Sequence, residues 1–322
     1  GAARIEQAWD LRGPARGKAG QQVLERFWGM LAAAEEPLHR AAMLLPEDPV
    51  PWEHLQWHGL GMQVGRPRLD EIWEELCRRD PGLFAAHYTR AQVLSEKWYG
   101  SHQELLDFAA RTVDRAPTGD PVTAVLPLAR FEITWARTAG SPLTPMALLE
   151  AQFIRPDVIS ELIWAVEKWL VRPRSHPRAA EAAHLFGAAF YLGGRHDYAR
   201  RLLSGLGDRL PEALPWAALN GTPARSYARA RRELNLAWRP AGTWPGGPPE
   251  PGLAVPRPAR RARAPRAAVS GGVRWAGSRQ VSGAWCGAAG SPPTGPGRAP
   301  VPRRRRRCTP GRRAGPRSRG SR

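Results

Sequence analysis

The sequence predicts an all-α protein in which antiparallel helix pairs stack into an α-solenoid, followed by a disordered C-terminal tail. Three observations predict this architecture. Apolar residues recur at spacings of three and four along most of the first 238 residues, as on the buried stripe of a helix. No stretch of five or more residues there alternates with β-branched residues as a strand does. Breaks at Pro49, Pro81 and Pro117 are 32 and 36 residues apart, a period typical of stacked helix pairs.

The expected helices follow one another with short breaks. The first, at residues 21–35, carries its apolar residues on one stripe: Val23, Leu24, Phe27, Trp28 and Leu31. Prolines separate several of the later segments because proline lacks the N–H that a helix interior needs. These segments are residues 38–45, 51–64, 68–79, 83–97, 101–115, 122–138, 145–153, 156–171, 177–192 and 197–210.

Charge divides the chain near residue 239. The 322 residues carry a formal net charge of +19. Residues 239–322 contain 19 Arg, no Lys and one acidic residue, Glu250, which gives a net charge of +18. Residues 1–238 contain 29 basic and 28 acidic residues and are long enough for a sizeable core. We therefore expect a lead-in at residues 1–20, a helical-repeat domain at 21–238 and a tail at 239–322. The chain begins with Gly1 rather than Met, which indicates either processing or a truncated start.

The composition of the tail allows three interpretations. Arg, Pro, Gly and Ala account for 62 of its 84 residues, so it cannot bury enough apolar area to fold and is expected to be disordered. The Arg block at residues 303–307 would bind nucleic-acid phosphates without sequence specificity. A specific nucleic-acid module is disfavoured because aromatic residues are too sparse for base stacking. GC-rich DNA translated out of frame or by read-through would also give this composition.

Residues 183–211 can be compared with a tetratricopeptide repeat position by position. The repeat's apolar, small and proline positions are filled by Phe186, Gly187, Phe190, Ala199, Leu203, Leu206 and Pro211. Two positions depart from the pattern, since Ala183 stands where Trp is usual and Leu206 where Ala is usual. The segment thus resembles tetratricopeptide repeats, and small residues such as Gly187 would lie where two helices cross closely. An irregular helical bundle without true repeats is the alternative.

A wider resemblance covers residues 20–235. Its carrying stretches are residues 43–52, 79–81, 147–169, 183–211 and 216–232. On these stretches the chain resembles uncharacterised helical-repeat proteins of high-GC actinobacteria. The matching motifs are structural, so the resemblance implies a fold and no activity.

Motifs for catalysis, metals and cofactors do not form a usable pattern. Glu53, His54 and His58 share a helix, but in an order that differs from the zinc-protease motif. The glycines at residues 59–65 follow a helix, whereas a dinucleotide loop follows a strand. Cys77 stands alone in the folded part, and no serine lies in a nucleophile elbow. We therefore expect a non-enzymatic protein without a metal or cofactor. With three Cys and no apolar run of membrane-spanning length, we also expect neither a disulfide scaffold nor a membrane protein, but a cytoplasmic one.

The predicted function is that of an interaction scaffold. The first helix of each pair would line a concave groove that binds an extended peptide or another protein. The repeat register nominates the groove residues Tyr88, Gln92, Glu96, Glu181, His184, Ala188 and Tyr191. In the alternative interpretation these residues cover the neighbouring helix pair. Binding of nucleic acid through the basic tail is the second function, and it requires that the tail exists in the cell.

Overall fold

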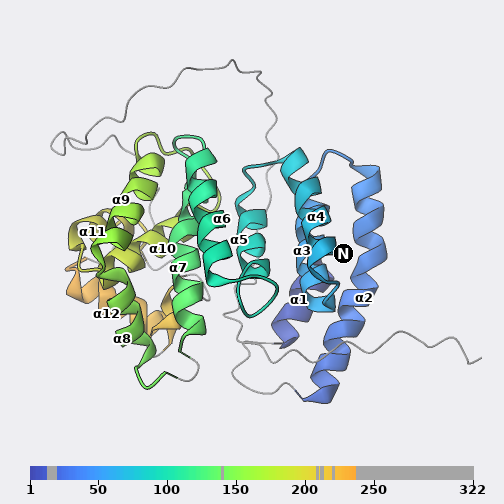
Figure 1. The fold of residues 1–322 in the computed structure, drawn as a ribbon, viewed down its shortest axis with the longest axis horizontal. Helices are drawn as coiled ribbons and strands as arrows, with labels where there is room; N and C mark the ends of the chain where they lie inside the picture. Colours follow the sequence, from blue (N-terminus) through green and yellow to red (C-terminus); the bar gives the residue numbers. More distant parts are fainter. Residues whose placement is uncertain (13–19, 139–140, 208–209, 211–213, 220–221, 237–322) are drawn as a thin grey trace, which may run out of the picture. The chain divides into compact units, whose positions relative to one another are not determined.

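The computed structural model describes residues 1–12, 20–138, 141–207, 210, 214–219 and 222–236. Within these ranges the chain forms twelve α-helices and two short 3-10 segments, and no strand (Figure 1). The prediction of an all-α protein is therefore confirmed for this part of the chain. The basic tail, with its predicted disorder and its nucleic-acid arm, lies outside the described residues. No helix in the described ranges is both long enough and apolar enough to cross a lipid bilayer.

The expected lead-in contributes a helix to the core. Helix α1 (Ala2–Arg12) buries Ile5, Ala8 and Trp9. The Trp9 ring lies edge-on to Phe27 and Trp57, with ring centroids 5.1 and 5.3 Å apart. Ile5, Ala8 and Trp9 have the helical spacing of three and four, but this short segment lies outside the regular repeat and was not expected to be a helix. The folded region thus includes residues 2–12, which were expected to be a lead-in.

One continuous helix, α2 (Gln21–Leu44), replaces the two that were expected at residues 21–35 and 38–45. Pro37 lies inside this helix and has no N–H to donate to the carbonyl of Ala33, four residues earlier. Arg4 of α1 donates a hydrogen bond from Nη1 to that carbonyl. The expected break is wrong because a contact from another helix replaces the missing bond.

The next helices begin and end close to their expected positions. They are α3 (Val50–Met62), α4 (Arg66–Arg79), α5 (Phe84–Val93) and α6 (His102–Arg115). Pro49 precedes α3, while Pro81 and Pro117 follow α4 and α6, so all three predicted breaks separate helices. The Ser101 hydroxyl caps α6 by accepting a hydrogen bond from the Glu104 amide at 3.2 Å. Helix α5 stops four residues before the expected end because residues 94–100 form turns.

The C-terminal half of the domain contains the remaining elements. They are η1 (Pro121–Ala124), α7 (Val125–Ala136), α8 (Pro145–Phe153), α9 (Pro156–Leu170), α10 (Ala179–Leu192), α11 (His196–Leu203), η2 (Trp216–Ala218) and α12 (Pro223–Glu233). The segment expected at residues 122–138 thus begins as a 3-10 turn. Helix α11 ends at Leu203 rather than at residue 210, since Gly205 and Gly207 follow and Gly207 has a φ of +58°.

Helices of two kinds make up the core. Helices α3, α5, α7 and α10 are buried around most of their circumference, whereas α4, α6, α9 and α11 each bury a narrower stripe. The deeply buried helices contact one another in order, α3 with α5, α5 with α7 and α7 with α10. Consecutive helices also pack together, as in α3 with α4, α6 with α7 and α10 with α11. We call α4, α6, α9 and α11 the outer helices, because each keeps a face that is open for other contacts.

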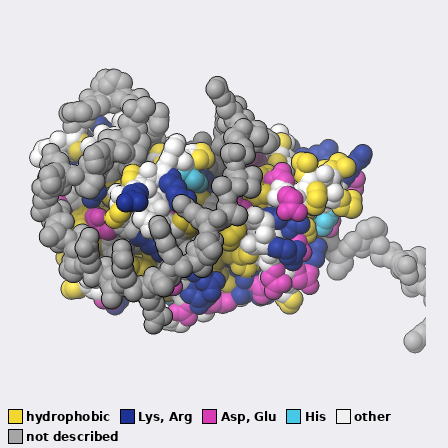
Figure 2. Space-filling model, turned by 90° about the horizontal axis from the view of Figure 1, so that it is seen from above, with side chains coloured by type: hydrophobic (Ala, Val, Ile, Leu, Met, Phe, Trp, Pro, Cys, Tyr) yellow, Lys and Arg dark blue, Asp and Glu magenta, His cyan; other side chains and the backbone are white. Residues whose placement is uncertain are grey.

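Charged side chains of both signs are interspersed on the described surface. Figure 2 shows acidic and basic side chains next to one another on one face. Several form ion pairs at the surface, such as Arg68 with Glu71 and Arg155 with Asp157, both at 2.6 Å. Exposed pairs of this kind contribute at most about 1 kcal/mol each. Residues 1–238 carry nearly equal numbers of basic and acidic residues, so a group of unpaired charges of one sign stands out.

Candidate functional site

The structure places the nominated groove residues mostly inside the molecule. Tyr88 and Gln92 on α5 are buried, and Glu96, in the turn after α5, is exposed. The four nominated residues of α10 are all buried: Glu181, His184, Ala188 and Tyr191. Their role in binding a partner therefore stays a prediction, and their contacts within the chain come first.

Polar contacts connect the nominated residues of α5 and of the turn after it to other elements. Gln92 Nε2 donates to Glu132 Oε1 on α7 at 2.7 Å, and Lys97 Nζ lies 2.9 Å from the other oxygen of that carboxylate. Glu96 Oε2 lies 2.8 Å from His102 Nε2. The Arg178 guanidinium lies 5.7 Å from the centre of the Tyr88 ring. These contacts tie α5 to α6, α7 and the start of α10.

The nominated residues of α10 contact each end of the helix and the elements that follow it. Arg178 donates two hydrogen bonds to the Glu181 carboxylate, at 2.6 and 2.9 Å. Trp216 Nε1 donates to His184 Nδ1 at 3.0 Å. Tyr191 donates its hydroxyl to Glu233 of α12, and burial, together with this carboxylate, raises the pKa of Tyr191 to about 12.

The predicted repeat-packing residues lie between α10 and α11. Phe186, Phe190, Ala199, Leu203 and Leu206 are all buried. A Cβ atom added to Gly187 would lie 2.5 Å from Leu203 Cδ2, which is far inside van der Waals contact. Gly187 therefore stands at a close approach of two helices. Pro211, the last position of the pattern, lies outside the described residues.

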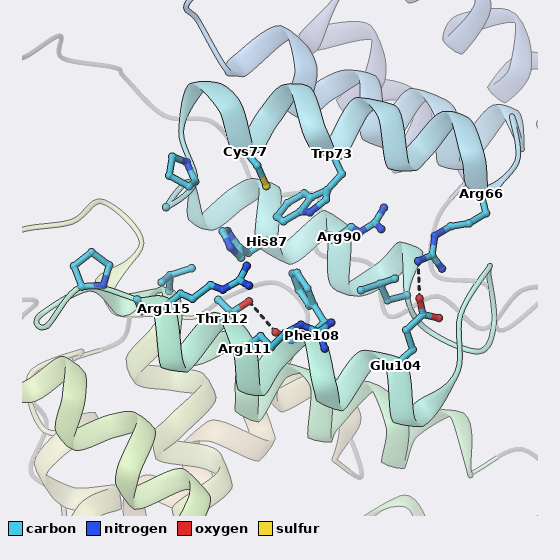
Figure 3. A pocket seen from close by; sticks show the side chains of 16 residues that line it. Arg66, Trp73, Cys77, His87, Arg90, Glu104, Phe108, Arg111, Thr112 and Arg115 are labelled. Carbon is cyan, nitrogen blue, oxygen red and sulfur yellow. Dashed lines mark hydrogen bonds and ion pairs between the residues drawn. The ribbon is translucent and has the colours of Figure 1, made fainter. Parts of the chain in front are cut away.

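A cleft that the sequence does not indicate lies between α4 and α6, with α5 as its floor. It has a volume of about 420 Å³. Figure 3 shows Trp73 and Cys77 on α4 facing Phe108 and Arg115 on α6. His87 and Arg90 reach it from α5. The cleft cannot be inferred from the sequence of any one helix, because its walls come from α4 and α6 and its floor from α5, which lies between them.

The centre of the cleft is aromatic and uncharged. The His87 ring lies edge-on to Trp73 and stacks on Phe108, with centroid distances of 5.1 and 5.8 Å. Its Nδ1 is 3.0 Å from the carbonyl oxygen of Leu83, which fixes the proton on that nitrogen in the neutral ring. Burial lowers the pKa of His87, so the ring is neutral at physiological pH.

Two of the four arginines in the cleft are held by carboxylates. Arg66 Nε donates to Asp70 at 2.7 Å, and its Nη2 donates to Glu104 at 2.5 Å. Arg90 donates to the same Asp70 oxygen and lies 5.6 Å from the centre of the Trp73 ring. Two guanidinium groups thus face two carboxylates, and their charges balance.

The other two arginines, Arg111 and Arg115, are exposed on α6 at the edge of the cleft. Among the described residues neither side chain has a hydrogen bond or an ion pair. Asp107 lies one turn before Arg111 and accepts a hydrogen bond from Gln103 at 2.8 Å, and it forms no ion pair with Arg111 within 4.0 Å. Two guanidinium groups one helical turn apart are therefore available beside an aromatic floor.

The thiol of Cys77 lies on the α4 wall of the same cleft. Burial raises the pKa of Cys77, so the group is a thiol rather than a thiolate at neutral pH. Cys77 is half-buried. It is a poor nucleophile here, but it is a useful chemical reporter for the cleft.

Comparisons of the chain with protein-family models, with curated proteins and with solved structures found no match.

Proposed function

We propose that this protein is a non-enzymatic interaction scaffold, an α-solenoid of helix pairs that binds a segment of another protein. The ordered contacts of α3, α5, α7 and α10 support a stack in which each helix pair packs on the next. In such a stack the outer helices have no neighbour on one side, so binding sites form between them.

The cleft between α4 and α6 is the observation that carries the proposal. Its volume of about 420 Å³ lies within the range of pockets that accept ligands, and it combines apolar rings with a few polar groups at its edge. A short stretch of an extended chain could place one or two side chains in it. The buried residues nominated from the repeat register would support the cleft indirectly, because Tyr88 and Gln92 hold α5 in position.

The chemistry of the cleft favours binding over catalysis. The groups that are available for a ligand are guanidinium donors on Arg111 and Arg115. The Cys77 thiol is protonated, and His87 is enclosed by rings. Donors beside an aromatic surface orient a ligand without supplying a nucleophile.

Selection from a random peptide display library against the full chain tests the proposal. We expect enriched sequences that bind the parent protein. Gly82 lines the cleft and has room for a Cβ, whose nearest contact would be at 3.6 Å, so Gly82→Trp is designed to obstruct the cleft with a large side chain. Gly29→Trp on α2 is the matched control, because no atom lies within 4 Å of a Cβ there.

The two variants separate the possible results. Loss of peptide binding in Gly82→Trp, with binding kept in Gly29→Trp, is the expected outcome. A library that yields no enriched sequence, or sequences that bind both variants equally, would contradict the proposed function of the cleft.

A further inference from the structure

Among the side chains that line the cleft, counted together with Asp70, arginines outnumber carboxylates by two. Asp80 and Asp120 also lie beside Gly82, where their carboxylates accept hydrogen bonds from the backbone amides of Gly82 and Val122. Arg66 and Arg90 are balanced by Asp70 and Glu104, as their hydrogen bonds show. Arg111 and Arg115 have no such partner among the described residues. The neutral His87 adds no charge. A ligand that carries carboxylates would therefore complement the edge of the cleft, whereas a cationic segment would be repelled.

We propose that the cleft recognises an acidic protein segment, in which carboxylates bind Arg111 and Arg115 while a neighbouring apolar side chain packs on Trp73, His87 and Phe108. This inference rests on the proposed function and specifies the chemistry of the partner. Guanidinium groups bind carboxylates through two parallel hydrogen bonds, which gives orientation as well as attraction.

The spacing of the two arginines suggests the pattern of the segment. Residues four apart on a helix have Cβ atoms about 5–6 Å apart. In an extended peptide, alternate side chains lie on one side about 6.6–6.8 Å apart. Two acidic residues separated by one residue therefore match Arg111 and Arg115, and the apolar residues between and beside them can face the aromatic floor.

The basic tail makes a simple binding measurement ambiguous, because 19 arginines would also attract an acidic peptide. A readout inside the cleft removes the ambiguity. Cys77 lines the cleft, whereas Cys286 and Cys308 lie in the tail sequence. Alkylation of each cysteine in the full chain by iodoacetamide, followed by mass spectrometry of the digest, reports the two regions separately.

The probe is the capped heptapeptide Gly-Leu-Glu-Phe-Glu-Leu-Gly, and its control has Gln in place of both Glu residues. We expect the acidic peptide to slow the alkylation of Cys77 at least threefold and the Gln peptide to leave it unchanged. The double substitution Arg111→Gln and Arg115→Gln should weaken this protection at least tenfold in peptide concentration. Arg26→Gln, at an exposed arginine of α2 outside the cleft, should leave it intact.

Three results would overturn the inference: equal protection by both peptides, unchanged protection in the double variant, or binding of the acidic peptide without protection of Cys77. None of these results tests the proposed scaffold function, which the display selection tests separately. If display selects uncharged sequences whose binding is blocked by Gly82→Trp, the scaffold function holds and the acidic partner is wrong.

Discussion

Gly187 shows how a single hydrogen atom in place of a side chain permits two helices to approach. The residue lies in α10, and the nearest side chain is Leu203 of α11, which is fully buried. Leu203 cannot move outward without opening a gap in the core. The tetratricopeptide pattern indicates a small residue at this position for the same physical reason.

Gly187→Leu should therefore lower the free energy of unfolding by about 1–3 kcal/mol, because the new side chain must displace Leu203 or adopt a strained rotamer. Gly29→Leu, in the open middle of α2, should raise it by about 0.5–1 kcal/mol through helix propensity. Chemical denaturation of both variants measures the two effects. A neutral or stabilising Gly187→Leu would show that α10 and α11 do not cross at this residue.

His87 couples the cleft to pH. Burial lowers its pKa in the folded state below the ordinary value of 6.5. Above that value His87 is neutral in both states and its packing is fully retained. As the pH falls below 6.5, the unfolded chain binds a proton that the folded chain does not, so stability decreases.

His87→Phe keeps an aromatic ring between Trp73 and Phe108 and removes this titration. We expect the parent protein to lose more unfolding free energy than the variant when the pH is lowered from about 7 to about 5. Urea denaturation at a series of pH values gives the difference directly. Parallel curves for the two proteins would mean that His87 is as readily protonated in the folded state as in the unfolded one.

At the scale of elements, α2 departs most from what its sequence predicts. Pro37 normally ends or kinks a helix because it removes one hydrogen bond and crowds the preceding turn. The apolar stripe nevertheless continues across it, with Leu31, Ala34 and Leu38 all buried. Arg4 reaches the carbonyl that Pro37 leaves unpaired. A partner 29 residues away cannot be inferred from the local pattern of α2.

A double-mutant cycle between Arg4 and Pro37 tests this explanation. Arg4→Met should cost about 0.5–1.5 kcal/mol of unfolding free energy in the parent chain. In a Pro37→Ala chain the alanine N–H can bond to Ala33, so Arg4→Met should cost less. Equal losses in the two chains would indicate that the Arg4 contact does not substitute for the missing helix bond.

At the scale of the whole molecule, the helical class and most helix bounds could be predicted, because each depends on local periodicity and on prolines such as Pro49, Pro81 and Pro117. The place of helix α1 in the core could not, although Ile5, Ala8 and Trp9 have helical spacing, since its burial depends on contacts of Trp9 with Phe27 and Trp57. The cleft could not either. When α6 is considered alone, Phe108 is expected to be a core residue and Arg111 is expected to lie on a solvent-exposed face. Their combination with Trp73 and His87 requires three helices to be placed together.

Amide hydrogen exchange of the full chain, with and without a display-selected peptide, tests most directly the claim that the protein binds a segment between α4 and α6. In the parent protein we predict that the peptide slows exchange only in α4, α5, α6 and the turn at residues 80–83. In the Gly82→Trp variant we predict that the peptide leaves exchange unchanged. Protection located instead in α8–α12, or protection that persists in Gly82→Trp, would contradict the claim.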